Sequence, residues 1–319
     1  MTIAHKIFNK IISEVSKYII GREKELELLF ATLLSKTHML IEGPPGTAKT
    51  LMAKLFAQSL GLSFKRIQMT PDMVPADIVG AKIIDPKTGE LRTILGPIFA
   101  NVILVDEINR ASPRTQSALL EAMQERQVTI EGETHKLPKP FTVIATQNPW
   151  ETSGTFPLPD TQLDRFGIAI VVNYPSAKDE EKVVLKDHEL KSEEPSARKV
   201  VNGSILLEAV NEASQIHVED KIVKYIVSIV RATRNLREVT LGASPRASIM
   251  LLRYAKALAA IRNREYIIPD DVKYVAPYVL WHRIILNPSI YSSLTPIESF
   301  EEKARLIREK ILKKIPAPW

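Results

Sequence analysis

Short apolar runs alternate with amphipathic stretches over the first half of the chain. Residues 38–41, 102–105, 141–146 and 168–172 are dominated by apolar side chains, and residues 64–69 alternate well enough to form a strand. A strand that is apolar on both faces is typical of a parallel sheet covered by helices. The pattern therefore predicts an α/β domain built on a parallel sheet.

The pattern changes after Tyr174, and helical spacing dominates from there. We place a domain boundary near Ser176, so that residues 1–175 form the α/β domain and residues 176–319 form an all-helical domain. The charged segment 191–199 is expected to link the first two helices of the second domain. The predicted helices span residues 178–190, 203–213, 220–236, 245–262, 269–280 and 296–313.

The N-terminal segment, residues 1–20, has apolar side chains at helical spacing from Ile3 to Ile19. Charged residues interrupt it, so it does not resemble a signal peptide. We favour a helix docked on the protein body over an amphipathic membrane anchor. No apolar run approaches the roughly 18 residues that span a bilayer, and we expect a cytoplasmic protein without membrane insertion.

Two segments of the first domain have the signature of β-hairpins. Within residues 72–97, apolar stretches flank the sequence Asp-Pro-Lys-Thr-Gly at 85–89. Within residues 126–138, a turn is expected at Glu131-Gly132. Apolar runs separated by three to five residues that include glycine are typical of hairpins with longer loops.

Composition excludes some kinds of site. The 319-residue chain is 45% hydrophobic and 25% charged and has no cysteine, which excludes disulfides and thiolate metal sites. The net charge is +6, but half of this excess lies in residues 301–314. A local excess of charge is more often a solvated helix face than a nucleic-acid groove.

The strongest motif lies between the first predicted strand and a helix that begins near Leu51. It consists of Gly43, Pro44, Pro45, Gly46, Thr47, Ala48, Lys49 and Thr50. A glycine-bearing turn at a helix start presents backbone N–H groups to a phosphate. Lys49 would supply charge to the outer phosphates of a nucleotide, and the Thr50 hydroxyl would bind Mg²⁺.

Ala48 departs from this phosphate-binding loop motif, which normally has glycine before the lysine. Alanine tolerates helical geometry well. We therefore expect the turn to form with Ala48 inside the first turn of the helix.

Two carboxylates, Asp106 and Glu107, follow the apolar run at residues 102–105. Acidic residues at the C-terminal end of a buried strand lie at the ligand-binding edge of an α/β sheet. Asp106 would hold Mg²⁺, and Glu107 would polarise the attacking water. The alternative is an Asp-Glu helix cap, but the preceding phosphate-binding loop favours the catalytic interpretation.

Three further candidates have ordinary alternatives. Asn148 could orient a water near the γ-phosphate, yet an asparagine before proline is often a turn former. Arg165 could reach a phosphate or form a surface salt bridge. Ile20 and Gly21 could contact adenine or simply mark a helix boundary.

The motifs together resemble those of the MoxR family of AAA+ ATPases over about residues 20–285. They are, in order, GPPGTAKT, LVDEINRA, ATQNP, LPDTQLDRFG and GASPRA. The resemblance implies an αβα sandwich with a five-stranded parallel sheet, followed by a helical lid. The segments 72–97 and 126–138 would then be the helix-2 insert and the pre-sensor-1 hairpin.

The resemblance also implies the roles of single residues. Residues 43–50 would be Walker A, and Asp106 with Glu107 would be Walker B. Asn148 would be sensor 1, Arg246 would be sensor 2, contacting the γ-phosphate from the lid, and Arg165 would be the arginine finger. The implied nucleotide-binding set is Ile20, Gly21, residues 43–51, Asp106 and Arg246, with ATP and Mg²⁺ as cofactors.

Members of this family typically form hexameric rings and act on protein complexes with a separate von Willebrand factor A domain protein. We therefore expect a remodelling ATPase that works as a homo-oligomer. The competing hypothesis is a nucleic-acid motor, but the two hairpin segments have net charges of −1 and zero and contain no aromatic residue to stack bases. A third hypothesis, an ATP-binding scaffold without turnover, conflicts with the intact pair of Asp106 and Glu107.

Overall fold

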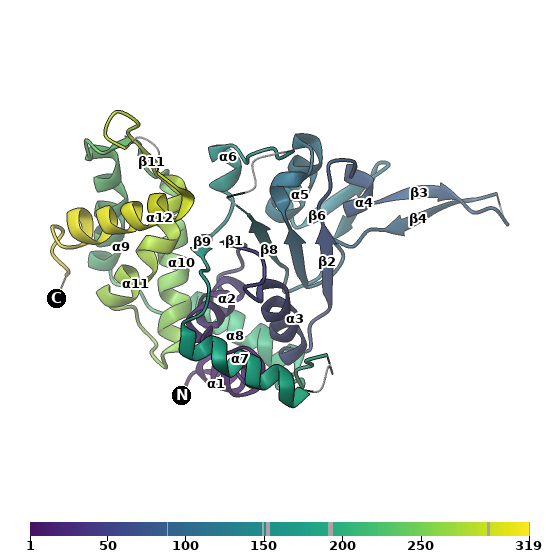
Figure 1. Cartoon of the computed structure of the whole chain (residues 1–319), viewed down its shortest axis with the longest axis horizontal. Coiled ribbons are helices and arrows are strands. Elements are labelled where there is room, and N and C mark those ends of the chain that lie inside the picture. Colours follow the sequence, from purple (N-terminus) through teal and green to yellow (C-terminus); the bar gives the residue numbers. More distant parts are fainter. Residues whose placement is uncertain (88, 149, 151–153, 191–193, 292–293, 319) are drawn as a thin grey trace.

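The chain forms an α/β lobe with a long protruding hairpin and a helical lobe that contains the C-terminus (Figure 1). The computed structural model describes residues 1–87, 89–148, 150, 154–190, 194–291 and 294–318.

A five-stranded parallel sheet is the centre of the α/β lobe, in the order β2-β5-β8-β1-β9. The strands are β1 (Met39–Glu42), β2 (Phe64–Gln68), β5 (Val102–Asp106), β8 (Thr142–Gln147) and β9 (Ile168–Val171). All five side chains of β5 are buried, whereas the edge strand β2 exposes Lys65 and Arg66. The predicted αβα sandwich is confirmed, and the carboxyl ends of all five strands meet at one edge of the sheet.

The helices of this lobe agree closely with the sequence pattern. They are α1 (Ile3–Val15), α2 (Glu23–Leu34), α3 (Lys49–Ser59), α4 (Pro75–Val79), η1 (Ile108–Arg110), α5 (Pro113–Glu125) and α6 (Asp160–Leu163). Ser112 caps α5 as expected, because its hydroxyl accepts a hydrogen bond from the Thr115 amide. The N-terminal helix α1 is docked on the body, where Ile7, Ile11 and Val15 are buried.

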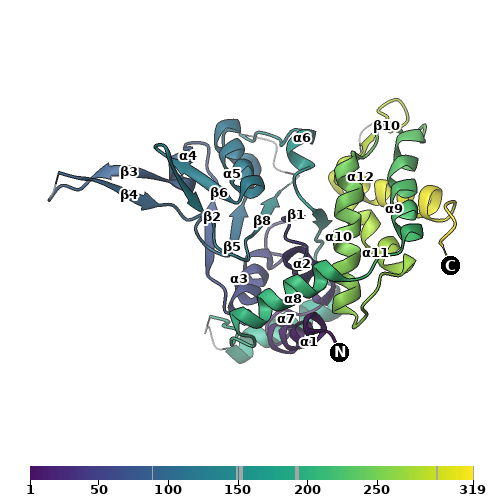
Figure 2. The same ribbon diagram turned by 180° about the vertical axis from the view of Figure 1, so that it is seen from behind.

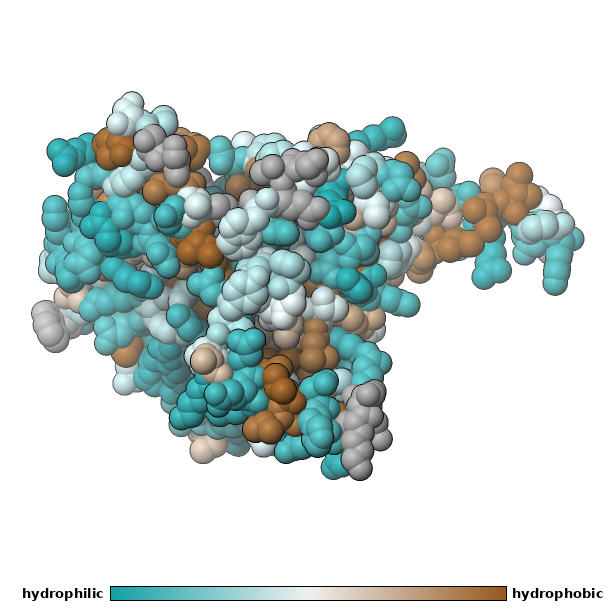
Figure 3. All heavy atoms as spheres, in the orientation of Figure 1, coloured by the Kyte–Doolittle hydropathy of each residue, from teal (hydrophilic) through white to brown (hydrophobic). Residues whose placement is uncertain are grey.

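Both predicted hairpins are present. One pairs β3 (Gly80–Ile84) with β4 (Leu91–Leu95), and the other pairs β6 (Gln127–Ile130) with β7 (Glu133–Lys136). The first projects far from the body (Figure 2). Its exposed apolar side chains colour this arm brown in Figure 3; they are Ile83, Ile84, Leu91, Ile94 and Leu95.

The second half of the chain is mostly helical. Its elements are α7 (Ala177–Leu190), α8 (Gly203–Gln215), α9 (Asp220–Ala232), η2 (Thr233–Asn235), β10 (Val239–Leu241), α10 (Pro245–Ile261), α11 (Pro269–Leu280), η3 (Trp281–Arg283), β11 (Ile285–Leu286), α12 (Pro296–Arg305) and η4 (Leu306–Leu312). No helix in the described residues is long and apolar enough to cross a bilayer.

Two details differ from the expected all-helical pattern. The strands β10 and β11 form a small antiparallel sheet, and the helix predicted for residues 220–236 ends at Ala232. The residues around β10 and β11 are largely β-branched, which favours extended backbone. The strands have only three and two residues, too few for a periodic pattern.

Residues after the predicted boundary near Ser176 run back over the first lobe. Helix α8 packs on α1 and α2 as well as on α10. The backbone amides of Ala197 and Val200 donate hydrogen bonds to Gln58 and Ser59 at the end of α3. Helix α7, in contrast, has no buried residue.

The basic C-terminal helix predicted over residues 296–313 is formed by α12 and η4, and it packs on the helical lobe, as expected. The ring of Phe300 contacts Trp281 edge-on with a centroid distance of 5.2 Å, and the indole N–H of Trp281 donates to the carbonyl of Ala169 in β9 at 2.7 Å. Arg305 pairs with Glu302 on the same helix at 2.6 Å. The Arg305 side chain is therefore part of the surface of the helical lobe.

A buried histidine anchors the start of β1. His38 Nε2 donates to the carbonyl of Met123 at 2.9 Å, and its Nδ1 accepts from the amide of Val143 at 3.0 Å. Burial lowers the pKa of His38 to about 4 from its usual 6.5. The imidazole is therefore neutral and holds β1, β8 and the end of α5 together.

We expect the free energy of unfolding to decrease as the pH is lowered, because of His38. Below pH 6.5 the unfolded chain binds a proton that the folded imidazole does not take up until about pH 4, so this contribution, about 3 kcal/mol at most, is lost as pH falls from 6.5 to 4. Urea unfolding of the parent chain and His38→Gln should measure it. The stability difference between the two should shrink with acidification, and a constant difference would contradict this role.

The pH dependence of the parent chain alone would not isolate His38, because Glu42 titrates in the same pH range. Burial raises the pKa of this carboxyl to about 7 from its usual 4.5. Its contribution to stability is therefore complete below pH 4.5 and is lost as pH rises towards 7. This trend opposes that of His38, and it cancels only when the parent chain is compared with His38→Gln.

Candidate active site

The loop between β1 and α3 borders a cavity of about 420 Å³ at the carboxyl edge of the sheet. The lining residues are Gly43, residues 45–51, Arg66, Gln68, Asp106, Glu107, Thr146, Gln147 and Asn148. A Cβ atom at Gly43 would lie 2.2 Å from the carbonyl oxygen of Val172. Only glycine fits at this position, because a methyl group would push the loop away from β9.

The alanine before the lysine of this motif has an unexpected conformation. Ala48 lies just before α3 as its N-cap, with φ +62° and ψ +22°. The expectation that Ala48 lies inside the helix is therefore wrong. Left-handed backbone costs a residue with a Cβ atom about 1–2 kcal/mol, which explains why glycine is usual here; the preceding Gly46 is also left-handed, with φ +78°.

Lys49 lies over the loop that it follows. Its Nζ donates to the carbonyls of Gly43 at 2.7 Å and Pro44 at 2.9 Å. Burial lowers the pKa of this ammonium, while Asp106 and Glu107 act in the opposite direction. The ammonium is thus held at the mouth of the loop, beside the backbone amides that would face a phosphate.

Asp106 is the polar centre of the cavity. Its Oδ2 accepts from Thr50 Oγ1 at 3.3 Å and from Arg66 Nε at 2.6 Å, and its Oδ1 accepts from Thr146 Oγ1 at 2.9 Å. A hydroxyl and a carboxylate at this separation match the oxygen ligands that Mg²⁺ prefers. The residues present therefore fit a Mg²⁺ ion bound through Thr50 and Asp106.

Glu107 has left-handed backbone, with φ +56° and ψ +53°. Its amide donates to Thr146 Oγ1 at 3.0 Å. Its carboxylate accepts from Gln68 Nε2 at 2.8 Å and pairs with Arg110 Nε at 2.9 Å. A strained backbone held by several contacts is typical of a functional position.

The sequence analysis missed Arg66, Gln68 and Thr146. Arg66 and Gln68 are polar residues near the end of β2, and Gln68 lies opposite Asp106 in the register of β2 and β5. A signal was available, because polar residues at the carboxyl end of a predicted strand belong to the ligand-binding edge. The missing information was the strand order.

Asn148 lines the cavity, and it also has the local contact of a turn residue. Its Oδ1 accepts from the amide of Trp150 at 3.3 Å. The two interpretations of this residue are therefore compatible. Ile20 and Gly21 are not among the residues that line the cavity. Gly21 has φ +70° between α1 and α2 and approaches Asp179 of α7.

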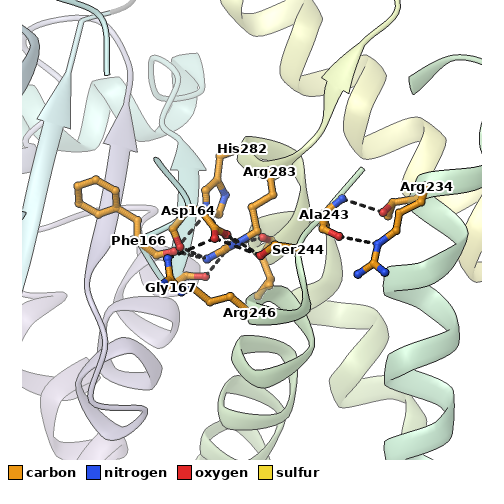
Figure 4. Close-up of polar contacts among 11 residues, drawn as sticks. Asp164, Phe166, Gly167, Arg234, Ala243, Ser244, Arg246, His282 and Arg283 are labelled. Atoms are coloured by element: carbon orange, nitrogen blue, oxygen red, sulfur yellow. Dashed lines mark hydrogen bonds and ion pairs between the residues drawn. The ribbon is translucent and has the colours of Figure 1, made fainter. Parts of the chain in front are cut away.

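Neither Arg165 nor Arg246 is among the residues that line this cavity. Arg246 lies beside Asp164, the residue that precedes Arg165 (Figure 4). Arg246 Nη1 pairs with Asp164 Oδ2 at 3.3 Å, and Ser244 Oγ donates to the same oxygen at 3.1 Å. Arg283 Nε donates to Asp164 Oδ1 at 2.7 Å. Asp164, the neighbour of Arg165 in sequence, thus joins the α/β lobe to the start of α10 and to η3.

The position of Arg165 relative to the sheet separates it from the cavity of its own chain. It precedes the amino end of β9, whereas the cavity lies at the carboxyl end of the parallel strand β1. The four paired residues of these strands span about 13 Å. Arg165 therefore belongs to the opposite edge of the sheet.

Removal of the Asp164 carboxylate should destabilise the fold. The side chain of Arg283 is 1% exposed, and Asp164→Ala would leave its buried charge without a carboxylate partner. Losing one member of a buried ion pair typically costs about 3–5 kcal/mol. Urea unfolding should show this loss, and Glu265→Ala, at an exposed carboxylate, serves as the control with little change. Equal stability of both variants would contradict the anchoring role.

The comparisons with known proteins agree with this geometry. Residues 38–168 match a model of the ATPase family associated with various cellular activities (AAA), and residues 231–303 match an AAA lid domain. Chaperone MoxR1 of Mycobacterium tuberculosis is 44% identical over 86% of this chain and 75% of its own. The chain belongs to the MoxR family of AAA+ ATPases. Protein MoxR of Paracoccus denitrificans is 28% identical over 89% of this chain and 90% of its own.

Two further comparisons cover nearly the whole chain. Uncharacterized protein YeaC of Bacillus subtilis is 45% identical over 89% of this chain and 88% of its own. A crystal structure from Cytophaga hutchinsonii, described as a "putative ATPase", superposes with a TM-score of 0.89 and 38% identity, covering 99% of this chain and 96% of that one. The AAA+ fold and the lid of this MoxR-family chain are thereby confirmed.

Proposed function

We propose that this MoxR-family ATPase hydrolyses ATP at sites shared between neighbouring subunits of a ring and uses the motion to remodel a protein complex. The observation that carries the proposal is the division of the machinery between two edges of one sheet. The phosphate-binding loop, Asp106 and Glu107 lie at the carboxyl edge, and Arg165 and Arg246 lie at the other.

At the carboxyl edge, each residue has a distinct task. The amides of residues 46–50 and the Lys49 ammonium bind the phosphates of ATP, and Thr50 and Asp106 hold the magnesium. Bound Mg²⁺ supplies charge neutralisation for the transferred phosphoryl group. Glu107 accepts a proton from the attacking water, and Asn148 orients that water. Gln68 and Arg110 hold the Glu107 carboxylate in place.

The opposite edge supplies the charges that complete the neighbour's site. Arg165 acts as the arginine finger, and Arg246 reaches the same γ-phosphate as sensor 2. Asp164 precedes Arg165 in the chain and pairs with Arg246 and Arg283, so hydrolysis in one subunit moves the lid of the next. We expect six subunits in the ring, as is typical of the family.

The projecting hairpin supports a protein as the client. Its five exposed apolar side chains form a surface of the kind that marks protein–protein contacts. A nucleic-acid motor, the alternative, would need a net positive charge or aromatic side chains there, whereas residues 72–97 have a net charge of −1 and no aromatic residue. We propose that the client complex includes a separate von Willebrand factor A domain protein, and that both act in the cytoplasm.

The dependence of specific ATPase activity on protein concentration tests the shared site. Activity per subunit should rise with concentration and reach a plateau as sedimentation velocity shows the oligomer forming. A flat specific activity across the concentrations at which the chain dissociates would refute the shared site.

The client hypothesis needs its own measurement. We expect a von Willebrand factor A domain protein to change the ATPase rate, whereas single-stranded DNA at physiological salt should not. Tight DNA binding with strong stimulation of the ATPase would favour the alternative function.

A further inference from the structure

Helix α7 lacks the packing that normally stabilises a helix of its length. None of its 14 residues is buried, and it exposes three consecutive large apolar side chains, Val183 (44%), Val184 (65%) and Leu185 (65%). Isolated helices of this length are marginal in water, and helices in proteins depend on burying an apolar face. The patch lies over the middle of α7 in Figure 3.

The exposed face of α7 also carries negative charge. Glu180, Val184 and Asp187 lie four and three positions apart, so they share one side of the helix. Asp179 pairs with Lys182 and Glu189 with Lys186, but Glu180 and Asp187 form no ion pair with another described residue. Helix α7 therefore presents apolar side chains flanked by free carboxylates.

A groove elsewhere on the molecule has the complementary chemistry. We call it the basic groove, and it consists of two adjoining cavities of about 600 and 280 Å³ that share Lys36 and Arg126. None of the described residues that line it is acidic. Its cations are Lys36, Arg126, Lys139, Arg253 and Lys256.

The groove also offers apolar contacts. Ile249 is 51% exposed and Leu207 is 40% exposed, and both line it together with Leu252. The hydroxyl of Ser35 in its wall is buried and has no hydrogen-bond partner among the described residues. A groove with apolar side chains and only positive charge fits an acidic amphipathic helix.

The groove is continuous with the edge that carries the two proposed catalytic arginines. Along α10, Arg246, Ile249, Arg253 and Lys256 are spaced by three, four and three residues, which places them on one side of the helix. Arg253 and Lys256 therefore lie about 10 and 15 Å from Arg246 along the axis. A neighbour bound at Arg246 would reach the groove.

Helix α7 starts at the opposite, nucleotide-binding edge. It follows β9, whose end pairs with the strand that leads into the phosphate-binding loop. Glu180 and Val184 lie four residues apart, about 6 Å along the helix axis, and Ile249 and Arg253 on α10 have the same spacing. Helix α7 is in front in Figure 1 and α8, which forms part of the groove, is in front in Figure 2.

We propose that α7 of one subunit docks in the basic groove of the next copy of this chain. The contact is head-to-tail, because different surfaces of the two copies meet, and such a contact closes into a ring when the rotation between copies is a whole fraction of a turn. It rests on the proposed function, since it extends the interface at which Arg165 and Arg246 meet the neighbour's ATP. The two helices run antiparallel, so that Glu180 faces Arg253 and Val184 covers Ile249.

The absence of native cysteine allows a direct test by disulfide cross-linking. Val184→Cys and Ile249→Cys are made in separate full-length chains, mixed with ATP and oxidised. We expect a heterodimer band that is at least tenfold stronger than with Val223→Cys, an exposed position on α9, in place of Val184→Cys. Arg253→Glu in the groove partner should abolish the band, whereas Arg231→Glu on α9 should not.

Exchanging the charges of Arg253 and Glu180 gives a second test, because a misfolded variant would not regain assembly when the second substitution is added. Arg253→Glu should weaken assembly in sedimentation velocity, and adding Glu180→Lys in the same chain should restore it, because the pair is rebuilt at every interface. No heterodimer band and no rescue would overturn the proposal. A band between two Val184→Cys chains alone would do the same, since it would mean that α7 pairs with itself.

Two further outcomes separate this proposal from related ones. A second assay mixes Arg165→Ala with Lys49→Ala, each inactive alone, and measures whether ATPase activity returns. Loss of the cross-link with activity restored in that mixture would reject α7 docking and keep the shared ATP site. A cross-link without such restoration would keep the docking and reject shared catalysis. Micromolar binding of inorganic tripolyphosphate to the groove, without the cross-link, would overturn docking in favour of a small-anion site.

Discussion

Arg165→Ala should lower ATP turnover by about 10³- to 10⁵-fold, the usual effect of removing an arginine finger. The reason lies in the sheet. Arg165 is at the amino end of β9, and the phosphate-binding loop is at the carboxyl end of the neighbouring strand β1. Only another subunit can bring this guanidinium to the γ-phosphate. Nucleotide binding to the separated subunit should be unchanged.

Mixing Arg165→Ala with Lys49→Ala should restore activity that neither variant has. In a random mixture, roughly a quarter of the head-to-tail interfaces join an intact loop to an intact arginine. Steady-state phosphate release measures this recovery, and Arg231→Ala, at an exposed position of α9, is the control that should keep full activity. Near-normal activity of Arg165→Ala alone would show that the site is complete within one chain.

The sequence predicts the elements of this fold because most of them are long enough to show a period. The apolar run at β5 and the helix α5 were predicted within one residue of their ends. The strands β10 and β11 were missed because two or three residues show no period. Local pattern thus specifies most of the elements, and the shortest ones depend on tertiary packing.

The residues of the candidate site also fall into those that the sequence predicts and those that depend on tertiary structure. Residues within one contiguous motif, such as Lys49 and Thr50, were found from spacing alone and line the cavity. Gln68 was missed because its contact with Glu107 depends on the pairing of β2 with β5. The conformation of Ala48 was predicted wrongly because helix propensity does not report the left-handed turn that precedes the helix.

The grouping of Arg165 with Arg246 also depends on tertiary structure. Asp164 accepts from Arg246 of α10 and from Arg283 of η3, and these residues are distant in sequence. No periodicity connects them. The lid is thus fixed to the edge that carries Arg165 in its own chain. If the proposed shared site holds, a change at one ATP site would reach the lid of the adjacent subunit.

Glu107→Gln should lower turnover by about 10²- to 10⁴-fold while ATP binding and assembly persist. The amide keeps the size of the side chain but does not accept a proton from water. The contacts of the carboxylate with Gln68 and Arg110 mean that Glu107 is positioned before substrate arrives. Single-turnover phosphate release measures the chemical step, and equilibrium binding of a fluorescent ATP analogue measures affinity.

Gln68→Ala distinguishes proton transfer from positioning. It removes the 2.8 Å hydrogen bond to Glu107 Oε2 but keeps the carboxylate, so we expect a smaller loss than with Glu107→Gln. The residual activity should retain its acidic limb in a pH–rate profile, because a carboxylate still acts as the base. If Glu107→Gln turned over ATP as fast as the parent chain, another group would have to activate the water, and the strained backbone of Glu107 would need a purely structural explanation.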